Sequence, residues 1–95
     1  MAEYRTHMKI IGDILQTTRD DLPDDEGATV TYLIRKANIS HVRISRILRT
    51  LVSQGLLEQI NDQGNNKYKI SSSGREFLQA YHSFSSFAEN FGLNI

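Results

Sequence analysis

The sequence predicts a small α+β fold, mostly helical, with three helices, a β-hairpin and one further helix in that order. Three observations support this class. Apolar residues recur at helical spacing through most of the first 55 residues. The spacing changes to strand-like alternation after Gly55, and helical spacing returns beyond the serines at 71–73. At 95 residues, the chain has room for one domain with a single modest core.

Two helices are predicted in the first 37 residues. In the first, from about Tyr4 to Arg19, Met8, Ile11 and Leu15 share a face at i, i+3 and i+7 spacing. The segment DDLPDDEG ends this helix, because its proline cannot continue it. The next segment, ATV, is β-branched enough for a very short strand, and Thr31 is expected to cap a short helix after it. The apolar face of that helix consists of Leu33, Ile34 and Ala37.

A third helix is predicted from about His41 to Gly55. Asn38 tolerates the left-handed backbone conformation of a tight turn, and Ser40 is a good N-cap. Ile39 and Ile44 occupy the positions of a hydrophobic staple around this cap. Gly55 suits the position just after the last helical turn. These signals together predict a helix-turn-helix unit.

The rest of the chain predicts a hairpin and a final helix. LLEQIN and KYKIS alternate as two strands, and the turn cluster DQGNN joins them. Ser73 and Glu76 form a capping box for a helix from about Gly74 to about Phe91, which Gly92 weakens near its end. A helix-turn-helix followed at once by a β-hairpin is a winged helix. We therefore predict a winged helix-turn-helix domain over residues 1–73 and a C-terminal dimerisation helix over 74–95, packed on the same domain.

The charge of the chain is polarised, although its net value is zero. From Gly27 to Leu57 there are five basic residues and no acidic one, whereas DDLPDDE just before it holds five of the eleven acids. A polyanion responds to a local field more than to a net sum. The basic segment is therefore a candidate surface for nucleic acid.

The third helix carries this charge on one face. At about 100° per residue, its apolar face consists of Ile44, Ile47, Leu48, Leu51 and Val52. The opposite face consists of Val42, Arg46, Arg49 and Ser53, with Arg43 and Ser45 at its edges. In a helix-turn-helix, the outward face of the second helix enters the DNA major groove. His41, Val42, Ser45 and Arg46, near its N-terminus, are expected to meet base edges, and Arg43 and Arg49 phosphates.

Two alternatives remain open at this point. The arginines could form only a solvated face, although such helices usually include glutamate partners at i, i+4 and this one has none. A winged helix could also serve as a protein–protein interaction module in a transcription or chromatin assembly. In that case exposed apolar residues would be more typical than arginines on this face.

The segment LIRKANISHVRISRILRTLVSQGLLEQ, followed by NKYKISSSGREFLQAY, resembles an archaeal winged-helix family of predicted transcriptional regulators. That family includes small dimeric, chromatin-associated DNA-binding proteins with a C-terminal coiled-coil helix. The resemblance covers about residues 8–81 and implies a cytoplasmic, nucleoid-associated homodimer that binds double-stranded DNA. The acidic first loop is longer, and the last helix shorter and more aromatic, than the family pattern. The predicted DNA-binding residues are Ser40, His41, Val42, Arg43, Ser45, Arg46 and Arg49, with Asn65, Asn66 and Lys67 in the wing.

The predicted last helix also has an apolar seam. Phe77, Tyr81, Phe84, Ala88 and Phe91 follow one another at spacings of 4, 3, 4 and 3, which is a heptad pattern. A helix of this length, about 27 Å, extends beyond one small core, so its outer part is expected to need a partner. A second copy of the chain is the expected partner, although the helix could instead pack back on its own domain. The predicted dimer interface is Tyr81, Phe84, Phe87, Ala88 and Phe91.

Other kinds of function find little support in the sequence. The chain has no cysteine, and its three histidines are isolated, so we expect no metal site. No phosphate loop or nucleophile elbow surrounds the serines, so we expect neither an enzyme nor a cofactor. The apolar runs are too short for a membrane span. Nothing indicates a small-molecule effector, although an interface rich in phenylalanine could hold one.

Overall fold

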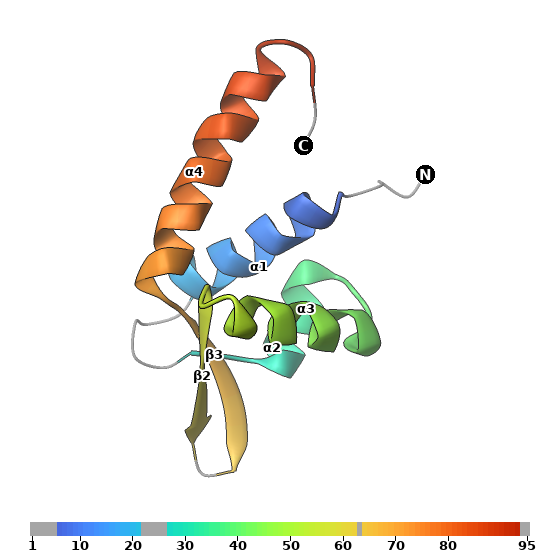
Figure 1. The fold of residues 1–95 in the computed structure, drawn as a ribbon. Helices are drawn as coiled ribbons and strands as arrows, with labels where there is room; N and C mark the ends of the chain where they lie inside the picture. Colours follow the sequence, from blue (N-terminus) through green and yellow to red (C-terminus); the bar gives the residue numbers. More distant parts are fainter. Residues whose placement is uncertain (1–5, 22–26, 63, 94–95) are drawn as a thin grey trace.

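The structure is a computed structural model that describes residues 6–21, 27–62 and 64–93. The described part contains four helices and a three-stranded antiparallel sheet in the strand order β1-β3-β2 (Figure 1). In chain order the elements are α1 (His7–Asp20), β1 (Ala28–Thr29), α2 (Val30–Ala37), α3 (His41–Ser53), β2 (Leu57–Asp62), β3 (Asn65–Ile70) and α4 (Ser72–Glu89). This order confirms the predicted winged helix-turn-helix architecture. The predicted short strand is also present, as β1 at the edge of the sheet.

One hydrophobic core joins the three N-terminal helices, the sheet and the first half of α4. The face of α1 that packs into it is centred on Ile10, Ile14 and Leu15, whereas Met8 in the first turn is exposed. The prediction that Met8 belongs to the buried face is therefore wrong. The largest fully buried side chains are those of Ile10, Ile14, Leu15, Leu33, Ile44, Leu48, Leu57 and Leu78.

The caps that delimit the helix-turn-helix are mostly those predicted. Asn38 is left-handed, with φ 55° and ψ 52°, and the Ser40 hydroxyl accepts the N–H of Arg43 at 3.2 Å. The cap of α2, however, is Thr29 rather than Thr31, because the Thr29 hydroxyl accepts the N–H of Tyr32. Thr29 is also the last residue of β1, so pairing with β3 holds it extended, as an N-cap requires. The helix consequently begins at Val30, inside the predicted strand.

The junction between α3, β2 and α4 depends on two glycines and a serine. Gly55 has φ 78°, and hydrogen bonds from Gly55 N to Val52 O and from Leu56 N to Leu51 O close α3 as a Schellman motif. The Ser71 hydroxyl caps α4 by accepting the N–H of Gly74, and it also donates to Gly55 O at 2.5 Å. The predicted capping box at Ser73 is therefore wrong. Of the serines at 71–73, only Ser71 has a hydroxyl that hydrogen-bonds to both Gly74 N and Gly55 O.

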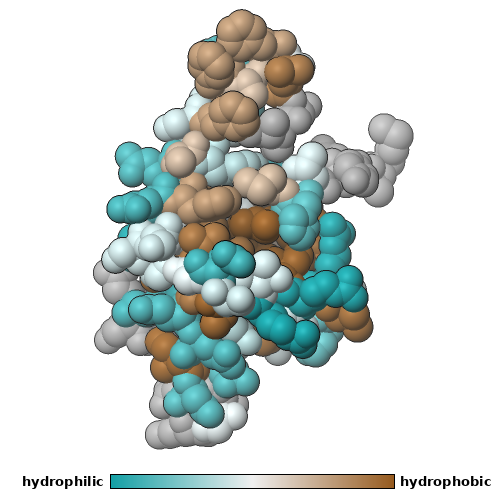
Figure 2. All heavy atoms as spheres, in the orientation of Figure 1, coloured by the Kyte–Doolittle hydropathy of each residue, from teal (hydrophilic) through white to brown (hydrophobic). Residues whose placement is uncertain are grey.

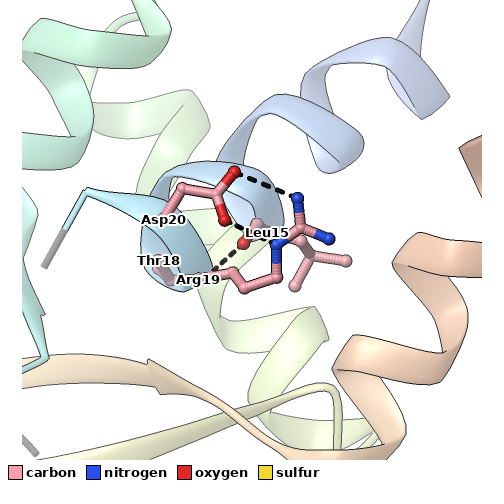
Figure 3. Close-up of polar contacts among 4 residues, drawn as sticks. All are labelled: Leu15, Thr18, Arg19 and Asp20. Atoms are coloured by element: carbon pink, nitrogen blue, oxygen red, sulfur yellow. Dashed lines mark hydrogen bonds and ion pairs between the residues drawn. The ribbon is translucent and has the colours of Figure 1, made fainter. Parts of the chain in front are cut away.

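The first half of α4 packs against α1. The ring of Tyr81 lies on Gly12, where an added β-carbon would be 2.7 Å from the ring. At the C-terminal end of α1, the Thr18 hydroxyl donates to Leu15 O, and Arg19 binds the Asp20 carboxylate through two hydrogen bonds (Figure 3). These bonds lower the pKa of the Asp20 carboxyl. The C-terminal half of α4 projects from the rest of the domain (Figure 1).

Candidate nucleic-acid interface

The outward face of α3 presents the predicted set of side chains. Ile44, Ile47, Leu48 and Leu51 are buried, which fixes the rotation of the helix about its axis. Arg43, Arg46 and Arg49 are exposed as a result, and Val42 is 69% exposed beside them. His41 is exposed and Ser45 is half-buried at the edge toward the sheet. The predicted division of this helix into an apolar and a basic face is confirmed.

The arginines of this face are available for an external ligand. Within the described residues, Arg43, Arg46 and Arg49 form no ion pair. On α2, by contrast, Lys36 lies 3.5 Å from the Asp21 carboxylate and 5.9 Å from the centre of the Tyr32 ring. The positive charge that α3 presents to solvent is therefore not compensated by described neighbours. A negatively charged ligand is the natural complement of such a surface.

The hairpin of β2 and β3, which we call the wing, is longer and tighter than predicted. Gly64 takes φ 84° in the turn, and the strands pair from Leu57–Ile70 out to Asp62–Asn65. The expectation that Asn65 and Asn66 lie in a loop is wrong, because both belong to β3. Asn66 is exposed on the wing. The side chain of Asn65 lies outside the described residues.

The two faces of the wing differ, and the difference determines the direction in which Lys67 points. Directly paired residues of an antiparallel sheet share a face, and faces alternate along each strand. The inner face, toward α3 and the core, includes the pairs Leu57–Ile70, Gln59–Tyr68 and Asn61–Asn66. The outer face includes the pairs Glu58–Lys69 and Ile60–Lys67. Lys67 is thus half-buried on the face that points away from α3, where it pairs with Thr29 on its other side.

A groove separates the basic face of α3 from the inner face of the wing. It has a volume of about 250 Å³ and is lined by Val30, Ser45, Leu48, Arg49, Val52, Gln59 and Tyr68. Arg49 is the one charged residue of this lining. Gln59 and Tyr68 were not among the predicted site residues. Each lies two residues from a buried apolar residue of the same strand, Leu57 or Ile70, and this spacing was the signal in the sequence that could have placed them on the inner face.

A second surface of interest lies on the projecting half of α4. Phe84, Phe87 and Phe91 are 58%, 59% and 68% exposed, and we call these three residues the outer stripe. The rings of Phe87 and Phe91 contact each other, with centroids 5.1 Å apart. Figure 2 shows apolar side chains gathered at this end of the molecule. The outer stripe has no covering element in the described part of the chain.

Two residues of the predicted seam point elsewhere. Tyr81 is 7% exposed and belongs to the core of its own domain, and Ala88 is 4% exposed. Both residues belong to the predicted dimer interface, but neither side chain is exposed in the single chain. Phe84, Phe87 and Phe91 still follow one another at heptad spacings of 3 and 4. They lie on an exposed face of α4 that is rotated away from α1.

Among the residues that the structure describes, His, Asp and Glu side chains nowhere gather in a group of three that could hold a metal ion. Among the four helices, none combines the length and apolar character of a membrane span.

Comparisons with known proteins agree with this architecture. A family model described as winged helix-turn-helix matches residues 4–89. The structure is similar to that of Sso10a-2, a DNA-binding protein from Sulfolobus solfataricus, with 26% sequence identity and a TM-score of 0.76; 92% of this chain and 85% of that chain are covered. It also resembles MepR, a transcription regulator of the Staphylococcus aureus multidrug efflux pump MepA, with 19% identity, a TM-score of 0.70 and coverages of 86% and 60%. No curated protein sequence matches this chain.

Proposed function

Because the chain belongs to the winged helix-turn-helix family, we propose that it binds double-stranded DNA as a homodimer and regulates transcription or organises chromatin. The observation that supports this proposal is the face of α3, with three exposed arginines and no described ion pair. The DNA-binding Sso10a-2, similar over 92% of this chain, favours the same ligand. The proposed role is one of binding and not of catalysis.

In the proposed complex, α3 enters the major groove with its N-terminal half. Arg46 would donate to the O6 and N7 of a guanine, and Val42 would contact a thymine methyl group. Arg43 and Arg49 flank the helix and would pair with phosphates on either side of the groove. Ser40 and His41 begin the helix, so they would lie where it first meets the duplex. The wing would contact the DNA beside the site through Asn66.

A second copy of the chain is the proposed cover for the outer stripe. Each chain offers three phenylalanine rings at heptad spacing, so two α4 helices can bury them against each other. A two-fold dimer presents two copies of α3, ideally about 34 Å apart, to successive major grooves on one side of the duplex. The dimer would therefore favour sites with two half-sites one helical turn apart.

DNA affinity is expected to fall steeply with salt. Each arginine–phosphate contact releases about 0.9 counterion, so the logarithm of the affinity should fall linearly with the logarithm of the salt concentration. Fluorescence anisotropy with random duplex DNA across a salt series measures this slope. A flat dependence, or no binding at low salt, would favour the protein-interaction alternative, in which the exposed Val42 contacts a protein partner.

Arg46→Ala is expected to weaken specific binding by about 1–3 kcal/mol and to relax the preference at one base position. Arg46→Lys is the matched variant, because lysine keeps the charge but cannot form the bidentate contact. We expect Arg46→Lys to retain more non-specific affinity while losing base preference as Arg46→Ala does. Sequence selection with the three proteins measures both effects. If Arg46→Ala selects the same site with the same affinity as the parent, then α3 does not enter the groove with this face.

A further inference from the structure

The inner face of the wing lies toward α3, and its described residues include no charged group beside that helix. Its residues at the root are Gln59 and Tyr68, which pair directly across the two strands. Tyr68 packs its ring against the core, whereas Gln59 is exposed. The lysines of the hairpin, Lys67 and Lys69, lie on the outer face. Any contact that the root of the wing makes with a ligand of α3 therefore comes from neutral donors.

These neutral donors face Arg49 across the groove. The lining combines Ser45 and Arg49 from α3, Gln59 and Tyr68 from the sheet, and the apolar side chains of Val30, Leu48 and Val52. The lining contains a guanidinium, an amide and two hydroxyl groups, all of which can donate hydrogen bonds, and no carboxylate. This chemistry complements a tetrahedral oxyanion. The volume of about 250 Å³ leaves room for a phosphate together with part of the sugar attached to it.

We propose that this groove seats one backbone phosphate of the bound duplex, held by Arg49 and Ser45 from α3 and by Gln59 and Tyr68 from the wing. The inference rests on the proposed function, since it names the part of the DNA that this surface takes. The backbone must pass here if α3 occupies the major groove while the wing lies beside it. The phosphate would then fix the position of the wing relative to α3, and with it the register of α3 on the bases.

The proposal predicts that the two faces of the wing respond differently to the same change in charge. Gln59→Glu and Lys67→Gln each make the chain more negative by one unit, but only Glu at position 59 would face the phosphate. We expect Gln59→Glu to lower DNA affinity at least about 10-fold, because a hydrogen bond to a charged group is replaced by repulsion. Lys67→Gln is expected to lower it no more than about 3-fold, by its effect on the long-range field alone.

The salt dependence separates the contributions within the groove. Gln59→Ala and Tyr68→Phe remove neutral donors, so each should lower the affinity about 5- to 10-fold with no change in the salt slope. Arg49→Ala should lower the affinity and reduce the slope by about one. Tyr68→Phe keeps the ring that packs on the core, and Gln59 is exposed, so both variants are expected to keep the parent's thermal unfolding midpoint.

The decisive measurement uses DNA in which single phosphates are replaced, one at a time, by neutral methylphosphonates. At one position in each half-site, the substitution should weaken the parent protein more than it weakens Gln59→Ala or Tyr68→Phe, because each of these variants has already lost one contact to that phosphate. The inference is overturned if Gln59→Glu and Lys67→Gln weaken binding equally, or if the effects of Gln59→Ala and of every methylphosphonate are additive. In either case, a steep salt dependence of the parent's affinity would still support DNA binding, and only the phosphate site would be rejected. A parent protein that does not bind DNA would contradict both proposals.

Discussion

Phe84→Glu is expected to convert the proposed dimer into a folded monomer that binds DNA at least about 100-fold more weakly at a site with two half-sites. Phe84 is 58% exposed in the single chain, so the glutamate is solvated there and the domain keeps its core. In the dimer the same glutamate would be buried without a partner, which costs several kcal/mol. Separating the subunits removes the second half-site contact, and with it an avidity of about 10²–10⁴.

Sedimentation equilibrium and circular dichroism test this prediction together. Ser86→Glu is the matched control, because Ser86 is exposed on α4 two residues further along, about 200° around the helix. It adds the same charge to the same helix but not to the outer stripe, so it should remain a dimer. A Phe84→Glu protein that remains a dimer would place the interface on another surface. A Phe84→Glu protein that unfolds would show that the outer stripe belongs to the core of the single domain.

Gly74→Ala is expected to destabilise the fold by about 3 kcal/mol or more, at the upper end of overpacking effects. A β-carbon at this position would overlap the carbonyl oxygen of Leu56 and lie 2.8 Å from Cγ1 of Ile70. A backbone oxygen cannot rotate away as the end of a side chain can. The Ser71 hydroxyl also joins the start of α4 to the end of α3 here, so displacing α4 breaks that junction as well.

Thermal unfolding at a fixed protein concentration measures this loss, which corresponds to a midpoint lower by about 12 °C or more. Gly64→Ala is the control, since its φ is 84° but no atom lies within 4 Å of the added β-carbon. That variant should lose only about 1–2 kcal/mol, the cost of a left-handed backbone for alanine. If Gly74→Ala is no less stable than Gly64→Ala, then α4 does not pack closely on the α3–β2 turn.

The helix-turn-helix could be predicted from the sequence because its signals are local. A left-handed asparagine at position 38, the hydroxyl cap of Ser40 and a glycine at 55 fix the ends of α3 through atoms within a few residues. Once these ends were known, the apolar stripe determined which face of α3 is buried. The exposure of Arg43, Arg46 and Arg49 followed from that face alone, without knowledge of what covers it.

Local signals were ambiguous where two similar residues competed for one role. Thr29 and Thr31 are both able to cap α2, and Ser71 and Ser73 are both able to cap α4. The choice came from distant parts of the chain, since pairing with β3 holds Thr29 extended and Gly55 O accepts the Ser71 hydroxyl. The same is true of β1, whose two residues become a strand only through their partners on β3.

By itself, then, the sequence determined the order of the elements, the helix-turn-helix and the basic face of α3. Only the tertiary structure decided which side of an element with two usable faces is covered. Along α4, a heptad pattern runs through Tyr81 and Ala88 as well as through Phe84 and Phe91, and spacing cannot separate them. Gly12 on α1 leaves room for the Tyr81 ring, which turns that side of α4 inward and the outer stripe outward. In the wing, the burial of Leu57 and Ile70 likewise brings Gln59 and Tyr68 beside Arg49 and turns Lys67 away, because faces alternate along a strand.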